Sequence, residues 1–110
     1  MPQWTDIGPI DDFTKSTRKA VTAEQRRLLV IHLDGSLHAF ADHCPHAGLP
    51  LTDADLMGKI ITCPFHGYAF NVETGCNADY PSDSGKLVIF PIRKTDAGRV
   101  EVDLQPAESA

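Results

Sequence analysis

The chain has 110 residues, of which 42 % are hydrophobic and 23 % are charged, and its formal net charge is −5. This length fits one domain over residues 1–110 with a modest core, and the composition excludes a globally disordered chain. The acidic balance argues against a nucleic-acid-binding protein, which usually carries a basic face.

Strand signals begin with a hairpin. Residues 26–44 hold two apolar, β-favouring runs that join at Asp34-Gly35, a dipeptide suited to tight antiparallel turns. Residues 59–63 predict a short buried strand that ends at Cys63. Further strands are predicted over residues 68–75, 86–92 and 99–104, with turns at Gly75, Ser84-Gly85 and Ala97-Gly98.

Helical signal is weak. Residues 41–58 contain two prolines and two glycines, so we expect at most one helical turn there, over residues 52–57. The tail, residues 105–110, is expected to be flexible. The sequence therefore predicts an all-β domain of short antiparallel strands, a small sandwich or barrel.

The chain shows no targeting segment. The N-terminal sequence lacks the basic and apolar regions of a secretory signal, and no run reaches the roughly 18 apolar residues of a membrane span. Three cysteines, an odd number, do not make a disulfide framework. We therefore expect a cytoplasmic protein.

Two turns carry the residues that suggest chemistry. Residues 42–51 contain Cys44 and His46, and residues 61–70 contain Cys63 and His66. Each cysteine is followed directly by a proline, and a glycine follows each histidine closely, at Gly48 and at Gly67. Proline stiffens such a turn, and glycine lets the backbone pass close to a bound group.

Two thiolates and two imidazoles suit either of two metal centres. One is tetrahedral zinc, and the other is a Rieske [2Fe–2S] cluster, in which two cysteines bind one iron and two histidines bind the other. The ligand types alone do not separate these centres. Zinc fingers usually take both cysteines from one element, whereas here each turn supplies one cysteine and one histidine, which favours the cluster.

The two motifs, "CPHAG" and "CPFHG", resemble those of the Rieske-type ferredoxins, and the similarity extends over most of residues 28–75 and to the strand that ends in "RVEVDL". The resemblance implies a Rieske (ISP-like) fold of stacked antiparallel β-sheets with a small cluster-binding subdomain. It also implies that Cys44 and Cys63 bind the inner iron, and His46 and His66 the outer one.

Departures from the motif indicate the kind of Rieske protein. The positions that hold a disulfide in respiratory and photosynthetic Rieske domains are Leu49 and Phe65, so that bridge cannot form. The serine and tyrosine that donate hydroxyl hydrogen bonds there correspond to Tyr68 and Phe70. Fewer donors to sulfur stabilise the reduced cluster less, so we predict a reduction potential of about −150 mV, the low end of the Rieske range.

These features resemble the ferredoxin component of bacterial ring-hydroxylating oxygenase systems, used in aromatic hydrocarbon catabolism. Such a protein is an electron carrier and not an enzyme: it takes one electron from a flavin-dependent reductase and passes it to a terminal Rieske non-haem iron oxygenase. The chain leaves no plausible ligands for the mononuclear iron of a complete oxygenase. We expect a monomer that docks transiently with both partners.

Three alternatives remain at this stage. The first is the small subunit of an NAD(P)H-dependent nitrite reductase, which often lacks part of the ligand set and the glycine present here as Gly67. The second is a colourless, zinc-stabilised binding module. The third is a carrier for another monooxygenase or for an unrelated redox pathway.

Other candidate residues receive simpler interpretations. His32 and His38 are predicted to lie on strand faces without a function, His43 to be a bystander to the motif, and Cys76 to be a free thiol. Phe65, Tyr68 and Phe70 are predicted to pack under the cluster, and Pro81 to lie in the loop that covers it. A set of acidic residues could present negative charge to basic partners. These are Asp42, Asp53, Asp55, Asp79 and Asp83.

Overall fold

The computed structural model describes residues 4–43, 50–52, 54–63, 68–78 and 86–104. Its elements, in chain order, are β1 (Trp4–Pro9), α1 (Asp11–Thr14), β2 (Arg18–Ala23), β3 (Arg26–Leu33), β4 (Ser36–Ala41), β5 (Asp55–Met57), β6 (Ile60–Thr62), β7 (Ala69–Asn71), β8 (Ile89–Phe90), β9 (Ile92–Lys94) and β10 (Arg99–Asp103).

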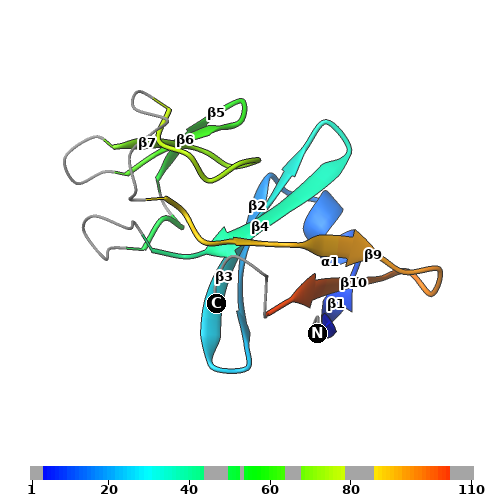
Figure 1. The fold of residues 1–110 in the computed structure, drawn as a ribbon. Coiled ribbons are helices and arrows are strands. Elements are labelled where there is room, and N and C mark those ends of the chain that lie inside the picture. The colour runs from blue at the N-terminus through cyan, green and yellow to red at the C-terminus, as the bar shows by residue number, and fades with distance from the viewer. Residues whose placement is uncertain (1–3, 44–49, 53, 64–67, 79–85, 105–110) are drawn as a thin grey trace.

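The strands form three antiparallel sheets, shown in Figure 1. The outer sheet has the order β1-β10-β9, the central sheet β2-β3-β4-β8, and the small sheet β5-β6-β7. The small sheet lies at one end of the molecule, beyond the central sheet. In the part of the chain that is described, α1 is the only helix, so the all-β prediction is confirmed.

Two tight turns build the central sheet. The predicted hairpin is confirmed: β3 pairs with β4, and the turn residues Asp34 and Gly35 have φ values of 50° and 82°. A second hairpin, β2–β3, turns at Glu24 and Gln25, whose φ values of 52° and 67° have the same sign. The sequence did not predict β2, because Glu-Gln is not a dipeptide that favours such turns.

The central sheet is buried on both faces, so the protein has two cores. Leu28 and Val30 of β3 pack with residues of the outer sheet and with Phe13 of α1. Leu29 and Ile31, which alternate with them, pack with residues from the small sheet and the segments around it. The continuous apolar run of β3 follows from this, since alternate side chains enter different cores.

Pro91 divides one predicted strand into two. The sequence predicts a single strand over residues 86–92, but the structure has β8 before Pro91 and β9 after it. β8 pairs with β4 of the central sheet, whereas β9 pairs with β10 of the outer sheet. Proline cannot donate to a ladder, so the chain changes sheets at this residue.

Other differences are local. Residues 55–57 form strand β5 rather than part of a helical turn, and a backbone bond from the Ala54 amide to the Leu51 carbonyl (3.1 Å) makes the turn before it. β1 and α1 were not predicted. The turn Ser84-Gly85 and the tail, residues 105–110, lie outside the described residues. Within the described part, no helix has the length and apolar character to cross a bilayer.

Candidate metal centre

Cys63 is the predicted ligand that the structure describes. It directly follows β6 and is fully buried in the core shared by the central and small sheets. Cys44, His46 and His66 lie outside the described residues, as do Gly48, Leu49, Phe65 and Gly67. Among the described residues, no three side chains of His, Cys, Asp or Glu form a metal-binding group.

The second ligand loop connects the two strands of a hairpin, β6 and β7. Thr62 of β6 faces Ala69 of β7, and the Cys63 amide donates to the Tyr68 carbonyl over 2.7 Å. Phe70 is fully buried in the same core as Cys63, and Tyr68 packs against that core, while their place under the cluster stays a prediction. A buried thiol at the root of a hairpin fits the inner-iron position of a Rieske cluster.

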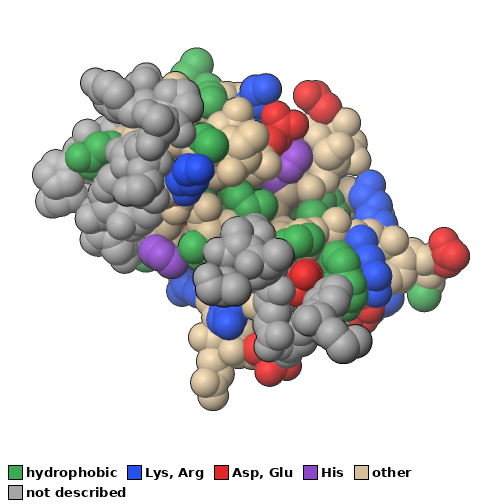
Figure 2. Space-filling model, viewed as in Figure 1, with side chains coloured by type: hydrophobic (Ala, Val, Ile, Leu, Met, Phe, Trp, Pro, Cys, Tyr) green, Lys and Arg blue, Asp and Glu red, His purple; other side chains and the backbone are tan. Residues whose placement is uncertain are grey.

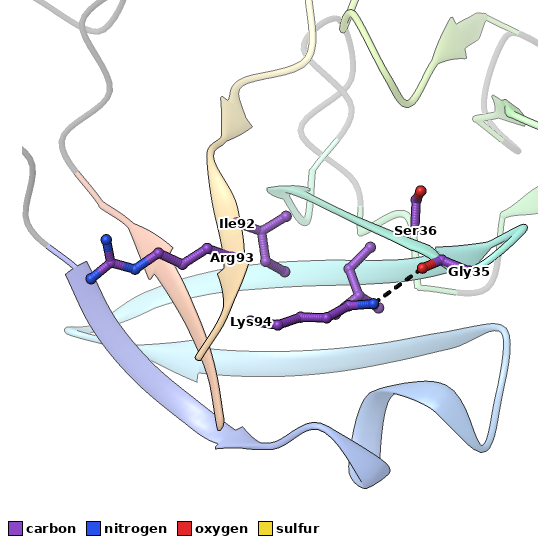
Figure 3. Close-up of a pocket in the computed structure, with 6 residues that line it drawn as sticks. Gly35, Ser36, Ile92, Arg93 and Lys94 are labelled. Atoms are coloured by element: carbon purple, nitrogen blue, oxygen red, sulfur yellow. Dashed lines mark hydrogen bonds between the residues drawn. The ribbon is translucent and has the colours of Figure 1, made fainter. Parts of the chain in front are cut away.

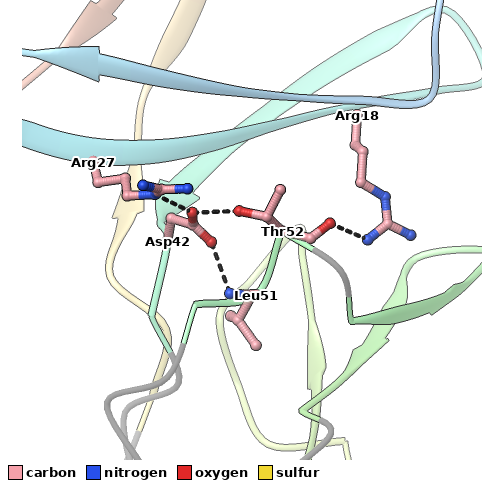
Figure 4. A network of polar contacts seen from close by, with 5 residues as sticks. All are labelled: Arg18, Arg27, Asp42, Leu51 and Thr52. Carbon is pink, nitrogen blue, oxygen red and sulfur yellow. Dashed lines mark hydrogen bonds and ion pairs between the residues drawn. The ribbon is translucent and has the colours of Figure 1, made fainter.

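The first ligand loop begins at Asp42, whose carboxylate lies at the centre of the network in Figure 4. Its Oδ1 accepts from the Leu51 amide (2.7 Å), and its Oδ2 accepts from Thr52 Oγ1 (2.5 Å) and Arg27 Nε (2.8 Å). The Asp42 side chain is fully buried, with 0 % exposure. Asp42 therefore does not present charge to a partner, and that interpretation of this residue is wrong.

Burial opposes the charge on Asp42, and hydrogen bonds favour it. Burial raises the pKa of this carboxyl, but the hydrogen bonds from Thr52, Arg27 and Leu51 together outweigh burial, so the pKa lies below its ordinary value. Asp42 is thus held as a buried carboxylate. Sequence reasoning missed the roles of Arg27 and Thr52, because they lie 15 and 10 residues from Asp42 in the chain and share no local pattern with it.

A second arginine fixes the segment after the first loop. One terminal nitrogen of Arg18, on β2, donates to the carbonyl oxygens of Thr52 (2.7 Å) and Ala54 (2.6 Å).

Of the other acidic residues suggested as a docking surface, Asp55 is exposed, and Asp53, Asp79 and Asp83 lie outside the described residues, as does Pro81. On the face in Figure 2, acidic and basic side chains are interspersed and not gathered by sign.

Several hollows mark the described surface. One, of about 270 Å³, lies between the Gly35 turn and β9, and its Lys94 ammonium is already bonded to the Gly35 carbonyl (3.1 Å; Figure 3). Another, of about 410 Å³, lies beside the start of the first ligand loop and is lined by Val88, Phe90 and the exposed His43, among others.

The other histidines and cysteines considered in the sequence lie on strands or beside turns of the fold. His32 of β3 and His38 of β4 are half-buried in the central sheet, opposite Leu37 and Ile31 respectively. Cys76 is half-buried, and its amide donates to Thr74 Oγ1 over 3.2 Å. Cys63 and Cys76, the cysteines that the structure describes, form no disulfide with each other.

This fold, with a buried cysteine at the root of a hairpin in a small sheet, fits an iron–sulfur domain of the Rieske class. Residues 3–91 match the family model of the Rieske [2Fe-2S] domain, and the chain belongs to this family. The protein therefore carries a Rieske-type [2Fe–2S] cluster, and the predicted cofactor and fold are confirmed.

Curated relatives match between 71 % and 94 % of this chain in the two examples that follow. The anthranilate 1,2-dioxygenase ferredoxin subunit of Burkholderia cepacia is 29 % identical over 94 % of this chain and 94 % of its own length. The ferredoxin CarAc of Metapseudomonas resinovorans is 34 % identical over 71 % of this chain and 74 % of its own length. These relatives are ferredoxins, and the prediction of an electron-transfer protein rather than an enzyme is confirmed.

Solved structures of dioxygenase complexes contain chains with a similar fold. A chain from the complex of reduced oxygenase and oxidized ferredoxin in carbazole 1,9a-dioxygenase superposes with a TM-score of 0.76 at 32 % identity, over 91 % of this chain and 92 % of that one. A chain from the reduced complex between oxygenase and ferredoxin of the same system has a TM-score of 0.80 at 23 % identity over 94 % of this chain. This protein spans 28 % of that longer chain, which shares the fold.

Proposed function

We propose that this protein is the one-electron carrier of a ring-hydroxylating dioxygenase system. It takes electrons from a flavin-dependent reductase and passes them to a terminal Rieske non-haem iron oxygenase. The observation that carries this proposal is the match with the anthranilate dioxygenase ferredoxin subunit, which covers 94 % of both chains. The carbazole complexes, which hold a ferredoxin together with an oxygenase, support the same kind of partner.

The proposed ligands are Cys44, His46, Cys63 and His66. Cys63 supports the assignment by its place in the described structure, because its thiol is buried at the end of β6. The described ends of both loops converge on one core, since Leu51 and Cys63 pack in the same buried cluster. A thiolate and an imidazole from each loop make up the Rieske donor set.

For electron transfer, the polypeptide supplies a rigid site from which water is excluded. The cluster, when bound, supplies a site that gains and loses one electron. Leu51, Ile61 and Phe70, each fully buried, exclude water from the thiol side of this site. Because these side chains belong to a packed core between two sheets, little has to reorganise when the charge of the site changes.

The proposal includes a soluble monomer in the cytoplasm, as the sequence predicts. No observation favours the nitrite reductase alternative, since one relative described above is a dioxygenase ferredoxin subunit and the other is a ferredoxin. A zinc-binding module is not compatible with membership of the Rieske family.

Stopped-flow spectroscopy tests the carrier role directly. The partners to use are a flavin-dependent reductase and a terminal oxygenase of a ring-hydroxylating dioxygenase system. NADH and catalytic reductase should bleach the visible absorbance of the protein, and oxidised oxygenase should restore it within the oxygenase turnover time. Product formation should depend on the concentration of the carrier. A protein that both partners leave unchanged in redox state would overturn the proposal.

Electron paramagnetic resonance (EPR) tests the ligands with matched controls in the chain. Dithionite-reduced protein should give a rhombic signal with an average g below that of all-cysteine ferredoxins. Substitution of His46 or His66 by alanine should abolish it, whereas His43→Ala should not. Cys63→Ser should abolish it, and Cys76→Ser should leave it intact. A signal that survives His46→Ala but is lost in His43→Ala would contradict the assignment.

A further inference from the structure

The two ends of the first ligand loop come from different sheets. Asp42 follows β4 of the central sheet, whereas Leu51 leads through Ala54 into β5 of the small sheet. In the described part of the chain, no backbone–backbone hydrogen bond joins residues 42–43 to residues 50–52. The ends meet through a side chain: Asp42 Oδ1 accepts from the Leu51 amide over 2.7 Å.

The second ligand loop differs in this respect. Its ends are neighbours in one hairpin, with Thr62 opposite Ala69. The Cys63 amide also donates to the Tyr68 carbonyl, so main-chain hydrogen bonds close the base of this loop. A side-chain substitution cannot remove such bonds directly, and the geometry of the second loop should be insensitive to side-chain chemistry at its base.

Two further side chains fix the orientation of the Asp42 carboxylate. Its second oxygen accepts from Thr52 Oγ1 and from Arg27 Nε, so both oxygens are satisfied in a fully buried position. Arg18 holds the Thr52 and Ala54 carbonyls in turn, as Figure 4 shows for Thr52. A carboxylate with all its partners in place has one orientation, and a charged acceptor makes the shorter, stronger kind of hydrogen bond.

We propose that Asp42 is the positioning residue of the first ligand loop: its carboxylate sets the spacing between the two loop ends, and thereby the placement of Cys44 and His46. This inference rests on the proposed ligand assignment. The expected consequence is asymmetric. Loss of the carboxylate should disturb the ligands of the first loop and leave Cys63 and His66 in place.

The test compares Asp42→Asn with a matched control, Asp6→Asn. Asp6 makes the same kinds of contact, since it accepts from the Gly8 amide (2.8 Å) and from Arg99, but it lies in the outer sheet, which carries neither ligand loop. Each purified protein is loaded with its cluster. The lifetime of the visible absorbance in air is measured, and pulsed EPR of the reduced protein resolves the two histidine nitrogen couplings.

We expect Asp42→Asn to lose its cluster at least about tenfold faster than the wild type, because a hydrogen bond to a charged group is worth about that factor in an equilibrium constant. One of its two histidine nitrogen couplings should change while the other stays the same. Asp6→Asn should match the wild type in both measurements. Wild-type lifetime and couplings in Asp42→Asn, or equal changes in both couplings, would overturn the inference.

If Asp42→Asn does not load a cluster, Thr52→Val decides. This variant keeps the carboxylate and its bond to Leu51 but removes one of the groups that orient it. It should load and show a smaller change in the same single coupling, and a wild-type spectrum would overturn the inference. The proposed function fails separately, because a wild-type protein without a mixed-ligand signal would contradict it, whatever Asp42 does.

Discussion

Leu28 and Leu29 are neighbours on β3, both fully buried, and they lie in different cores. Leu28 packs between the central and outer sheets, and Leu29 packs between the central and small sheets, in the cluster that includes Cys63. Both faces of one strand thus contribute to packed cores, but only the face that carries Leu29 shares its core with Cys63.

Alanine at either position should cost similar stability but have different effects on the cluster. Leu28→Ala and Leu29→Ala should each lower the free energy of unfolding by about 2–5 kcal/mol, as cavities in packed cores do. In native buffer, Leu29→Ala should lose the visible absorbance of the cluster faster than Leu28→Ala. Urea unfolding gives the first quantity and absorbance decay gives the second. Equal decay at equal stability would show that the cores are not separate.

The turns that could be predicted from the sequence are those marked by a local residue pattern. Asp34-Gly35, Gly75 and Ala97-Gly98 mark turns, and each has a glycine with positive φ in the structure. The hairpin at Glu24 and Gln25 could not be predicted, because the pairing of β2 with β3 imposes a positive φ on residues that do not favour it. The Asp42 network was also unpredictable, since its partners meet only after the sheets stack.

Gly75 is required by space as well as by conformation. Its φ is 80°, and a Cβ there would lie 2.7 Å from the Leu87 carbonyl oxygen and 3.0 Å from Ile89 Cγ1. The Gly75 carbonyl also accepts from the Leu87 amide (2.9 Å), which ties the end of the small sheet to the segment before β8. A side chain at this position must therefore displace backbone.

Gly98→Ala is the control for Gly75→Ala. Gly98 has a similar φ of 76°, but a Cβ there meets nothing within 4 Å. Gly98→Ala should therefore cost only the conformational strain, about 1–3 kcal/mol, and Gly75→Ala should cost clearly more. Thermal or urea unfolding of both variants measures the difference. If Gly75→Ala is no less stable than Gly98→Ala, the close approach of Leu87 has no energetic importance.

The ion pair between Asp6 and Arg99 lies in the outer sheet, and titration of the Asp6 carboxyl tests whether it forms. Arg99 Nε and one terminal nitrogen donate to the two Asp6 oxygens over 3.0 and 3.1 Å, across the register shift between β1 and β10. The hydrogen bonds from Arg99, followed by that from the Gly8 amide, hold the pKa of Asp6 below its ordinary value of 3.8. The pair also raises the pKa of Arg99.

The sign of the pH effect follows from the depressed pKa. The contribution of the Asp6 carboxylate to stability is present above the unfolded-state pKa, and it is lost as the pH falls through the lower folded-state pKa. Carbon-13 nuclear magnetic resonance of the Asp6 carboxyl should show a midpoint below 3.8, and Arg99→Gln should raise it. A midpoint that Arg99→Gln leaves unchanged would mean that the ion pair does not form in solution.

The reduction potential offers a test of the missing hydroxyl at Phe70. The wild type should have a potential of about −150 mV, the low end of the Rieske range. Phe70 is fully buried in the core that contains Cys63, so Phe70→Tyr places a hydroxyl in the surroundings of a ligand sulfur. Hydrogen bonds to sulfur stabilise the more negative, reduced cluster, and the potential should rise.

The expected rise is about 60 mV, which for one electron corresponds to a tenfold change in the equilibrium constant. EPR-monitored redox titration of both proteins measures it. Phe13→Tyr is the control, because it adds a hydroxyl to a fully buried side chain in the other core, which does not contain Cys63, and it should leave the potential unchanged. An unchanged potential in a folded, cluster-loaded Phe70→Tyr protein would show that this position does not reach the sulfur. The low potential would then come from other features of the two loops.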